Sequence, residues 1–126
     1  MIELSKEQII KYHEEIINST GGSNGLRDDS MLESALASAF QTFGGEDLYP
    51  SVTAKIARVA YGIIRNHPFV DGNKRIGTTT MVALLKANNI DVSFTDRDIV
   101  KIGLELATGQ MSDSRLDALI RERIKK

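Results

Sequence analysis

The residues best suited to chemistry lie together in one nine-residue segment, HPFVDGNKR at 67–75. Histidine is the side chain whose ordinary pKa suits proton removal near neutral pH, and His67 opens the segment. Asp71 offers a hard carboxylate oxygen, and Mg²⁺ is typically held by one or two carboxylates together with a substrate's own phosphates. Lys74 and Arg75 add a point charge and a bidentate fork for phosphate oxygens. Together these residues predict transfer of a phosphoryl or nucleotidyl group to a hydroxyl.

The backbone of the same segment predicts an anion site before any side chain is counted. Gly72 can take backbone angles closed to other residues, and Gly72, Asn73, Lys74 and Arg75 lead directly into a predicted helix. The first N–H groups of a helix are unpaired and lie at the positive end of its macrodipole. A histidine beside a proline, or Asp-Gly-Asn, is by itself most often structural. The joint occurrence of these residues between two apolar helices is what favours a functional site.

Two strongly apolar helices are expected to hold the segment between them. Residues 51–65 are apolar at helical spacing and rich enough in Ala and Ile to lie deep in the core. Pro68 ends this helix, because the residue before a proline is pushed out of the α region. A second helix is predicted near 74–88 and stops at Asn88-Asn89.

Four further helices are expected around this pair. Capping boxes predict the starts of three, and the pairs are Ser5 with Gln8, Ser30 with Glu33, and Thr95 with Asp98. Asp113 or Ser114 begins the last helix, and only residues 91–94, DVSF, alternate like a strand. The sequence thus predicts a compact all-α fold of about six helices, with residues 1–126 forming one domain.

Composition excludes several function classes. The chain has 126 residues and no cysteine, so it has no disulfide framework, thiol nucleophile or Cys-based zinc site. Its 16 Lys and Arg against 17 Asp and Glu leave no global field for nucleic acid or an anionic membrane. His13, the only other histidine, is expected to be a buried structural residue. No signal peptide or membrane span is recognisable, so we expect a cytoplasmic protein.

The segment 67–75 resembles the signature loop of the Fic/Doc superfamily, HxFx(D/E)GN(G/K)R, and Lys74 is typical of its death-on-curing (Doc) branch. GLRDDSMLESAL at 25–36 and TFGGEDLYP at 42–50 are similar to the stretches before that motif in Doc-like toxins. The resemblance implies an α-helical Fic fold in which the motif joins two central helices. It also implies ATP and Mg²⁺ as the small molecules that the protein uses.

The resemblance assigns a role to each residue of the motif. His67 would be the general base, Phe69 the buried anchor of the loop, and Asp71 the Mg²⁺ ligand. The nucleotide phosphates would be held by Gly72, Asn73, Lys74 and Arg75. The segment before the helix pair, which we expect to be an ordered loop or short hairpin, would be a flap that binds an extended stretch of the target; its residues are Thr42, Phe43, Gly44, Gly45 and Tyr49.

Two departures from the AMP-transferring branch favour phosphate transfer. That branch has Gly where this chain has Lys74, and a second Arg where this chain has Thr78. Doc-type proteins with this pattern resemble kinases that move the γ-phosphate to a Thr or Ser hydroxyl. The resemblance suggests elongation factor Tu as the target, so that translation halts, and a small antitoxin that folds onto the toxin as the inhibitor.

Two alternatives stay open at this stage. The first is AMP transfer to a protein, which uses the same residues with a different leaving group. The second is a non-catalytic module that binds a nucleotide or protein through a vestigial loop.

Overall fold

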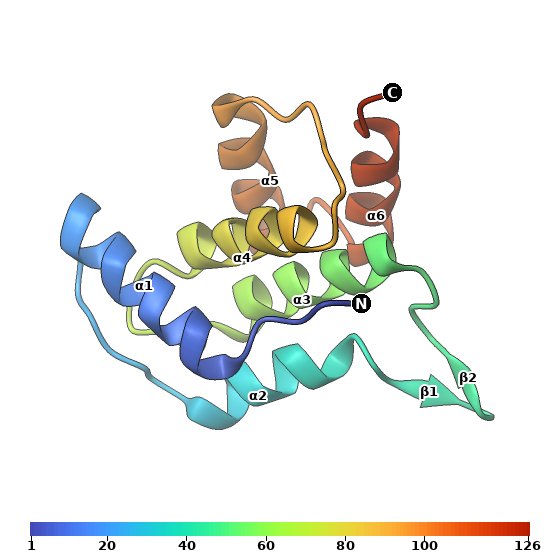
Figure 1. Cartoon of the computed structure of the whole chain (residues 1–126). Helices are drawn as coiled ribbons and strands as arrows, with labels where there is room; N and C mark the ends of the chain where they lie inside the picture. Colours follow the sequence, from blue (N-terminus) through green and yellow to red (C-terminus); the bar gives the residue numbers. More distant parts are fainter.

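The computed structural model describes all residues, 1–126, and folds them into six helices and one two-stranded hairpin (Figure 1). The elements in chain order are α1 (Lys6–Thr20), α2 (Asp29–Ser38), β1 (Thr42–Phe43), β2 (Glu46–Asp47), α3 (Val52–Asn66), α4 (Asn73–Ala87), α5 (Asp96–Thr108) and α6 (Asp113–Glu122). The expectation of a compact, mostly helical single domain is confirmed. No helix combines the length and apolarity needed to cross a bilayer.

Helix α3 is the centre of the core, and α2, α4, α5 and α6 all pack against it (Figure 1). Nine of its fifteen residues are buried, so its apolar surface extends around most of the helix. Small residues let its neighbours approach closely. A Cβ at Gly77 of α4 would overlap the side chain of Ile64, and one at Gly62 would lie 3.0 Å from Ala35 Cβ of α2. The predicted pair of apolar helices is therefore confirmed as the core.

The helix starts follow the sequence prediction except at α2. Ser5 with Gln8 and Thr95 with Asp98 form capping boxes, as expected. The N-cap of α2, however, is Asp28 rather than Ser30, and its carboxylate accepts from the N–H of Met31 at 3.2 Å. The reason is tertiary: Asp28 donates its own N–H to the carbonyl of Pro68, and this contact holds it in the extended conformation that an N-cap requires.

The strand-like alternation at 91–94 does not produce a strand. Val92 forms only an isolated bridge with Ile124, flanked by hydrogen bonds that join Ser93 and Asp91 to the end of the chain. A strand needs a continuous ladder, and only a few residues after α6 reach this segment. The segment at 41–50 does form a short hairpin, in which Thr42 pairs with Asp47 and Phe43 with Glu46.

Candidate active site

The segment 67–75 forms the connection between the end of α3 and the start of α4. His67 is the C-cap of α3 and adopts the left-handed conformation, with φ 54° and ψ 54°. A cavity of about 280 Å³ opens here, and its lining residues are Ile64, His67, Asp71, Gly72, Asn73, Lys74, Arg75 and Ala107. The fold thus gathers all the predicted base, carboxylate and phosphate-binding residues around one hollow.

Phe69 lies in the core beneath this cavity. Its side chain is 1% exposed, and its ring stacks on His13 of α1 with the ring centroids 3.9 Å apart. His13 is equally buried, and its Nε2 makes a 2.6 Å hydrogen bond with the carbonyl oxygen of Asp71. The expectation that His13 is a buried structural residue is confirmed, and its role is to tie α1 to the connection between α3 and α4.

Asn73 uses its side chain to hold the loop. Its Oδ1 accepts from the N–H of Phe69 and its Nδ2 donates to the carbonyl of Phe69, both at 3.0 Å. The side chain is buried, so these two bonds satisfy polar backbone groups that water does not reach. The phosphate-binding role predicted for Asn73 therefore narrows to its backbone N–H, at the start of α4.

The start of α4 differs from the starts of the other five helices. Side chains cap those five, and the capping residues are Ser5, Asp28, Ser51, Thr95 and Ser112. The N-cap of α4 is Gly72, in the left-handed conformation with φ 78°, and no side chain caps the helix. Lys74 beside it is exposed, and its ammonium makes no hydrogen bond or ion pair within the chain. Backbone N–H groups and one ammonium are therefore available to an anion.

Asp71 is held as an ionised carboxylate at the edge of the cavity. Its two oxygens accept from the N–H of Ser23 at 3.2 Å and the N–H of Gly72 at 2.8 Å. These hydrogen bonds, in that order, lower the pKa of Asp71, and the nearby charge of Arg75 lowers it further. Gly22 makes this approach possible, because a Cβ there would lie 2.7 Å from Asp71 Oδ2.

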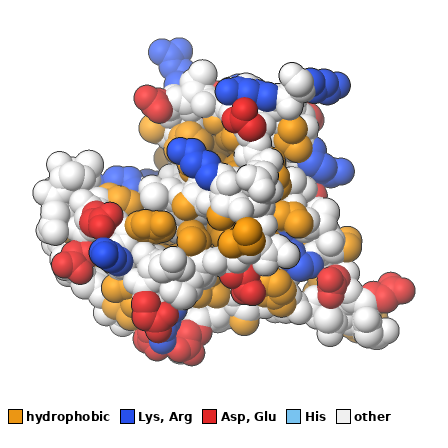
Figure 2. Space-filling view, in the orientation of Figure 1, with side chains coloured by type: hydrophobic (Ala, Val, Ile, Leu, Met, Phe, Trp, Pro, Cys, Tyr) orange, Lys and Arg blue, Asp and Glu red, His pale blue; other side chains and the backbone are white.

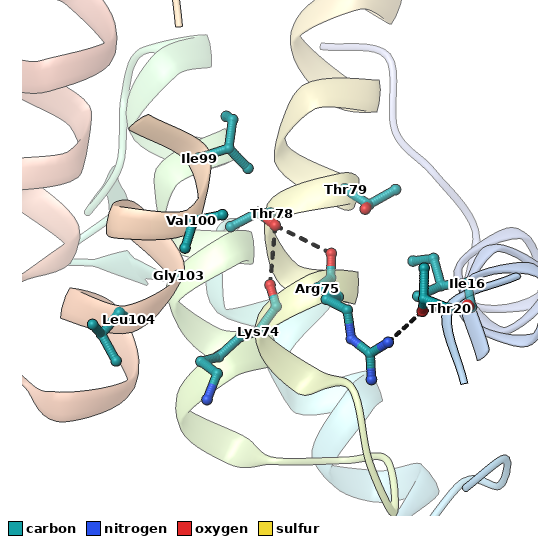
Figure 3. A pocket seen from close by; sticks show the side chains of 10 residues that line it. All are labelled: Ile16, Thr20, Lys74, Arg75, Thr78, Thr79, Ile99, Val100, Gly103 and Leu104. Atoms are coloured by element: carbon teal, nitrogen blue, oxygen red, sulfur yellow. Dashed lines mark hydrogen bonds between the residues drawn. The ribbon is translucent and has the colours of Figure 1, made fainter. Parts of the chain in front are cut away.

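The guanidinium of Arg75 turns toward α1. It donates to the hydroxyl of Thr20 and, at 3.2 Å, to the carbonyl of Gly21, while its Nη2 lies 4.0 Å from Asp71 Oδ1 (Figure 3). A guanidinium has five N–H donors, so these contacts leave some of them free. Arg75 therefore joins α4 to the end of α1 and lines the cavity at the same time.

A second hollow lies on the other side of Lys74 and Arg75, between α1, α4 and α5 (Figure 3). Its volume is about 460 Å³, and its lining residues are Ile16, Thr20, Lys74, Arg75, Thr78, Thr79, Ile99, Val100, Gly103 and Leu104. We call it the α1–α4–α5 groove. Figure 2 shows apolar side chains exposed over the middle of the molecule, in the orientation of Figure 1. Val100 and Leu104 of α5 are 72% and 52% exposed. They are apolar residues four positions apart that lie outside the buried stripe of this helix. That spacing is a signal in the sequence that could have predicted the groove.

The hairpin predicted as a flap lies at the opposite end of α3 from His67 (Figure 1). A helix of the fifteen residues of α3 is about 22 Å long, which separates the two. Phe43 is 81% exposed. Tyr49 instead anchors the hairpin: its hydroxyl donates to Asp113 at 3.1 Å, and Arg58 lies over its ring. No contact in the fold brings the hairpin beside His67.

The comparisons with known proteins agree with this geometry. The profile of the Fic/DOC family matches residues 3–85, which include the whole of the segment 67–75. The chain belongs to the Fic/DOC family.

Two relatives of this Fic/DOC protein are named for Doc. A protein named Toxin Doc from Mycolicibacterium smegmatis is 34% identical over 73 residues, which are 58% of this chain and 56% of that protein. This match therefore spans little more than half of the relative. A protein named Protein kinase doc from Escherichia phage P1 is 25% identical over 121 residues, 96% of this chain and 94% of that protein.

Proposed function

We propose that this Fic/DOC protein transfers the γ-phosphoryl group of ATP to a Thr or Ser hydroxyl of a target protein and acts as the toxin of a toxin–antitoxin pair. The observation that carries the proposal is the partnerless ammonium of Lys74 beside the uncapped start of α4, facing the same cavity as His67. The full-length similarity to a protein named Protein kinase doc supports the choice of reaction.

Each group in the cavity has a defined task in this reaction. His67 accepts the proton of the target hydroxyl as its oxygen bonds to the γ-phosphorus and the bond to the bridging oxygen of ADP breaks. The N–H groups at the start of α4 and the ammonium of Lys74 hold phosphate oxygens and stabilise the charge that develops on them. The side chains of Phe69 and Asn73 take no part in the chemistry, and they hold the loop in place.

Asp71 fits the role of ligand for the Mg²⁺ that accompanies a nucleotide. The carboxylate is exposed, its lowered pKa keeps it ionised at neutral pH, and the two hydrogen bonds that it accepts leave lone pairs unused. No group of three or more potential metal-ligating side chains surrounds it, so the remaining ligands would come from phosphate and water. When bound, the ion would neutralise phosphate charge.

Thr78 supports phosphate transfer over AMP transfer. Its hydroxyl donates to the carbonyls of Lys74 and Arg75, and its methyl group faces Gly103 of α5. The side chain therefore brings no second cation to the phosphates. A lysine at position 74, where the AMP-transferring branch has Gly, also occupies room beside the start of α4.

The position of the label that is transferred tests the reaction. The purified protein is incubated with an extract, and separately with elongation factor Tu, using ATP labelled at the γ- or the α-phosphate. We expect only the γ-label on protein, and Asp71→Asn should remove most of the Mg²⁺ dependence. Transfer of the α-label alone would replace the kinase proposal with AMP transfer, and unlabelled elongation factor Tu beside a labelled extract protein would exclude it as the target.

The α1–α4–α5 groove is the surface that best fits the antitoxin. It is apolar, it borders the phosphate-binding residues Lys74 and Arg75, and a further hollow of about 430 Å³ continues it along α4. An amphipathic segment that folds on binding would fill such a groove.

Co-expression tests this surface. The proposed antitoxin, when expressed together with this chain, should restore growth to cells that express the wild-type chain. We expect the double variant Val100→Glu, Leu104→Glu to remain toxic when that protein is present. Phe43→Glu is the control, because it changes an exposed apolar side chain far from the groove, at the hairpin. Equal rescue of both variants would exclude the groove.

A further inference from the structure

Arg27 makes an unusual set of contacts with the residue that we propose as the general base. Its Nε donates to the carbonyl of His67 at 2.8 Å, and its Nη2 donates to the carbonyl of Asn66 at 3.1 Å. Its backbone N–H donates to the carbonyl of Pro68 at 2.7 Å. One residue, forty positions away in the sequence, therefore pairs with three consecutive carbonyls at the end of α3.

The backbone conformation of His67 depends on these contacts. A residue other than glycine in the left-handed region is costly, and it persists only where its surroundings hold it there. Only His67 and Asn89 among the non-glycine residues have positive φ. The fork of Arg27 satisfies the last carbonyls of α3 while the chain reverses toward Pro68, so it stabilises the turn on which the imidazole is mounted.

No other group in the chain orients that imidazole. Neither ring nitrogen of His67 has a hydrogen-bond partner, whereas a catalytic histidine is commonly oriented by a carboxylate or carbonyl on its second nitrogen. The direction of the ring is therefore set by the backbone at His67. What holds that backbone also sets the position of the proposed base.

We propose that Arg27 is a positioning residue for His67: its guanidinium fork holds the left-handed turn at the end of α3 and so directs the imidazole into the cavity that Lys74 and Asp71 line. The inference rests on the proposed function, in which His67 is the base. The segment around it contributes to the same turn, since Asp28 also donates to Pro68 and Val70 donates to Gly25.

The test compares Arg27→Met with a matched control, Arg97→Met. Arg97 is exposed, like Arg27, but its side chain makes no hydrogen bond or ion pair. We expect Arg27→Met to lower kcat for γ-phosphate transfer by about 10- to 100-fold, because a small misplacement of a reacting group has effects of that order. The KM for ATP should change by less than about two-fold, because the phosphate-binding groups stay in place. Arg97→Met should match the wild type.

The chain's two histidines provide a readout that does not depend on activity. In NMR spectra of the ring protons, His67 should shift or broaden in Arg27→Met while buried His13 keeps its wild-type signal. Arg27→Lys keeps the charge but not the fork, so it should give an intermediate rate. Loss of the His13 signal in both Arg27→Met and Arg27→Lys would show that Arg27 is needed for folding, and would overturn the proposal. A wild-type kcat for Arg27→Met together with an unchanged His67 signal would overturn it as well.

The same assay separates this inference from the proposed function. If His67→Ala transfers phosphate at the wild-type rate, the assignment of His67 as the general base is wrong, whatever the rate of Arg27→Met. If His67→Ala is inactive and Arg27→Met is fully active, the reaction stands and the positioning role fails.

Discussion

The sequence predicts that the loop at 67–75 and the hairpin at 42–47 serve one reaction, but the two regions differ in how firmly the rest of the fold holds them. Buried contacts hold the loop in place. Phe69 is 1% exposed, the side chain of Asn73 pairs with the backbone of Phe69, and His13 of α1 stacks on the ring of Phe69. The hairpin consists of two residue pairs, and Phe43 in it is 81% exposed. The contacts of the loop therefore fix the positions of its residues, whereas the exposed side chains of the hairpin can be substituted without disturbing the core.

The firm support of the loop fits the role that we propose for it. A group that moves a proton must lie within hydrogen-bond reach of its partner, so its supports have to be rigid. An exposed hairpin meets no such demand, and its attachment is limited to its base, where Lys55 pairs with Asp47 at 3.2 Å and Tyr49 contacts α6. Predictions that set the two regions against each other therefore test the proposed site.

The largest expected effect is on activity. His67→Ala should lower γ-phosphate transfer by about 10²- to 10⁴-fold, because it removes the proposed general base. The side chain is exposed, so the unfolding transition should not change. Rates from labelled ATP measure this. Phe43→Ala should transfer phosphate at the wild-type rate, and a loss of more than about ten-fold in that variant would support the flap role predicted for the hairpin.

The next effect is on stability. Phe69→Ala should lower the free energy of unfolding by about 3–5 kcal/mol, because it opens a cavity in the core and removes the stack on His13. Phe43→Ala changes the same residue type at the exposed hairpin and should stay within about 0.5 kcal/mol of the wild type. Urea unfolding measures both, and similar losses in the two variants would contradict the comparison.

Asn73→Ala should lower the free energy of unfolding by less than Phe69→Ala does. The variant leaves the backbone N–H and carbonyl of Phe69 without partners, and an unsatisfied buried group costs about 1–3 kcal/mol. Asn24→Ala is the control, since Asn24 makes one exposed contact with its neighbour. Urea unfolding compares the two variants, and a loss for Asn73→Ala no greater than the control's would show that the loop does not depend on this clamp.

The smallest expected effect depends on pH. The pKa of Asp71 is lowered below its ordinary value of 3.8, so the ionised carboxylate stabilises the folded state at neutral pH. This contribution is fully present above that ordinary value and is lost as pH falls through the lowered pKa of the folded protein. Asp71→Asn should thus be less stable than the wild type at pH 7, and the difference should vanish in acid. Urea midpoints at several pH values measure it, and a difference that persisted in acid would contradict this account.

Local signals explain most of what the sequence predicted well. The capping boxes at Ser5 and Thr95 join residues three positions apart, so their hydrogen bonds can be read from spacing alone. The apolar periodicity of α3 and α4 likewise predicts which helices lie in the core. The same approach failed at Ser30, because a contact from Pro68 selected the cap. The strand-like alternation at 91–94 formed no strand, because no neighbouring strand was there to pair.

By itself, the sequence determined which helices form and which nine-residue segment is the candidate site, since both depend on neighbours along the chain. Only the tertiary structure decided which of those residues are free to act. It assigned the side chain of Asn73 to Phe69, turned Arg75 toward α1, placed the hairpin a helix length from His67, and brought Arg27 to the end of α3. Each of these outcomes depends on contacts between distant segments, which exist only once the helices have packed.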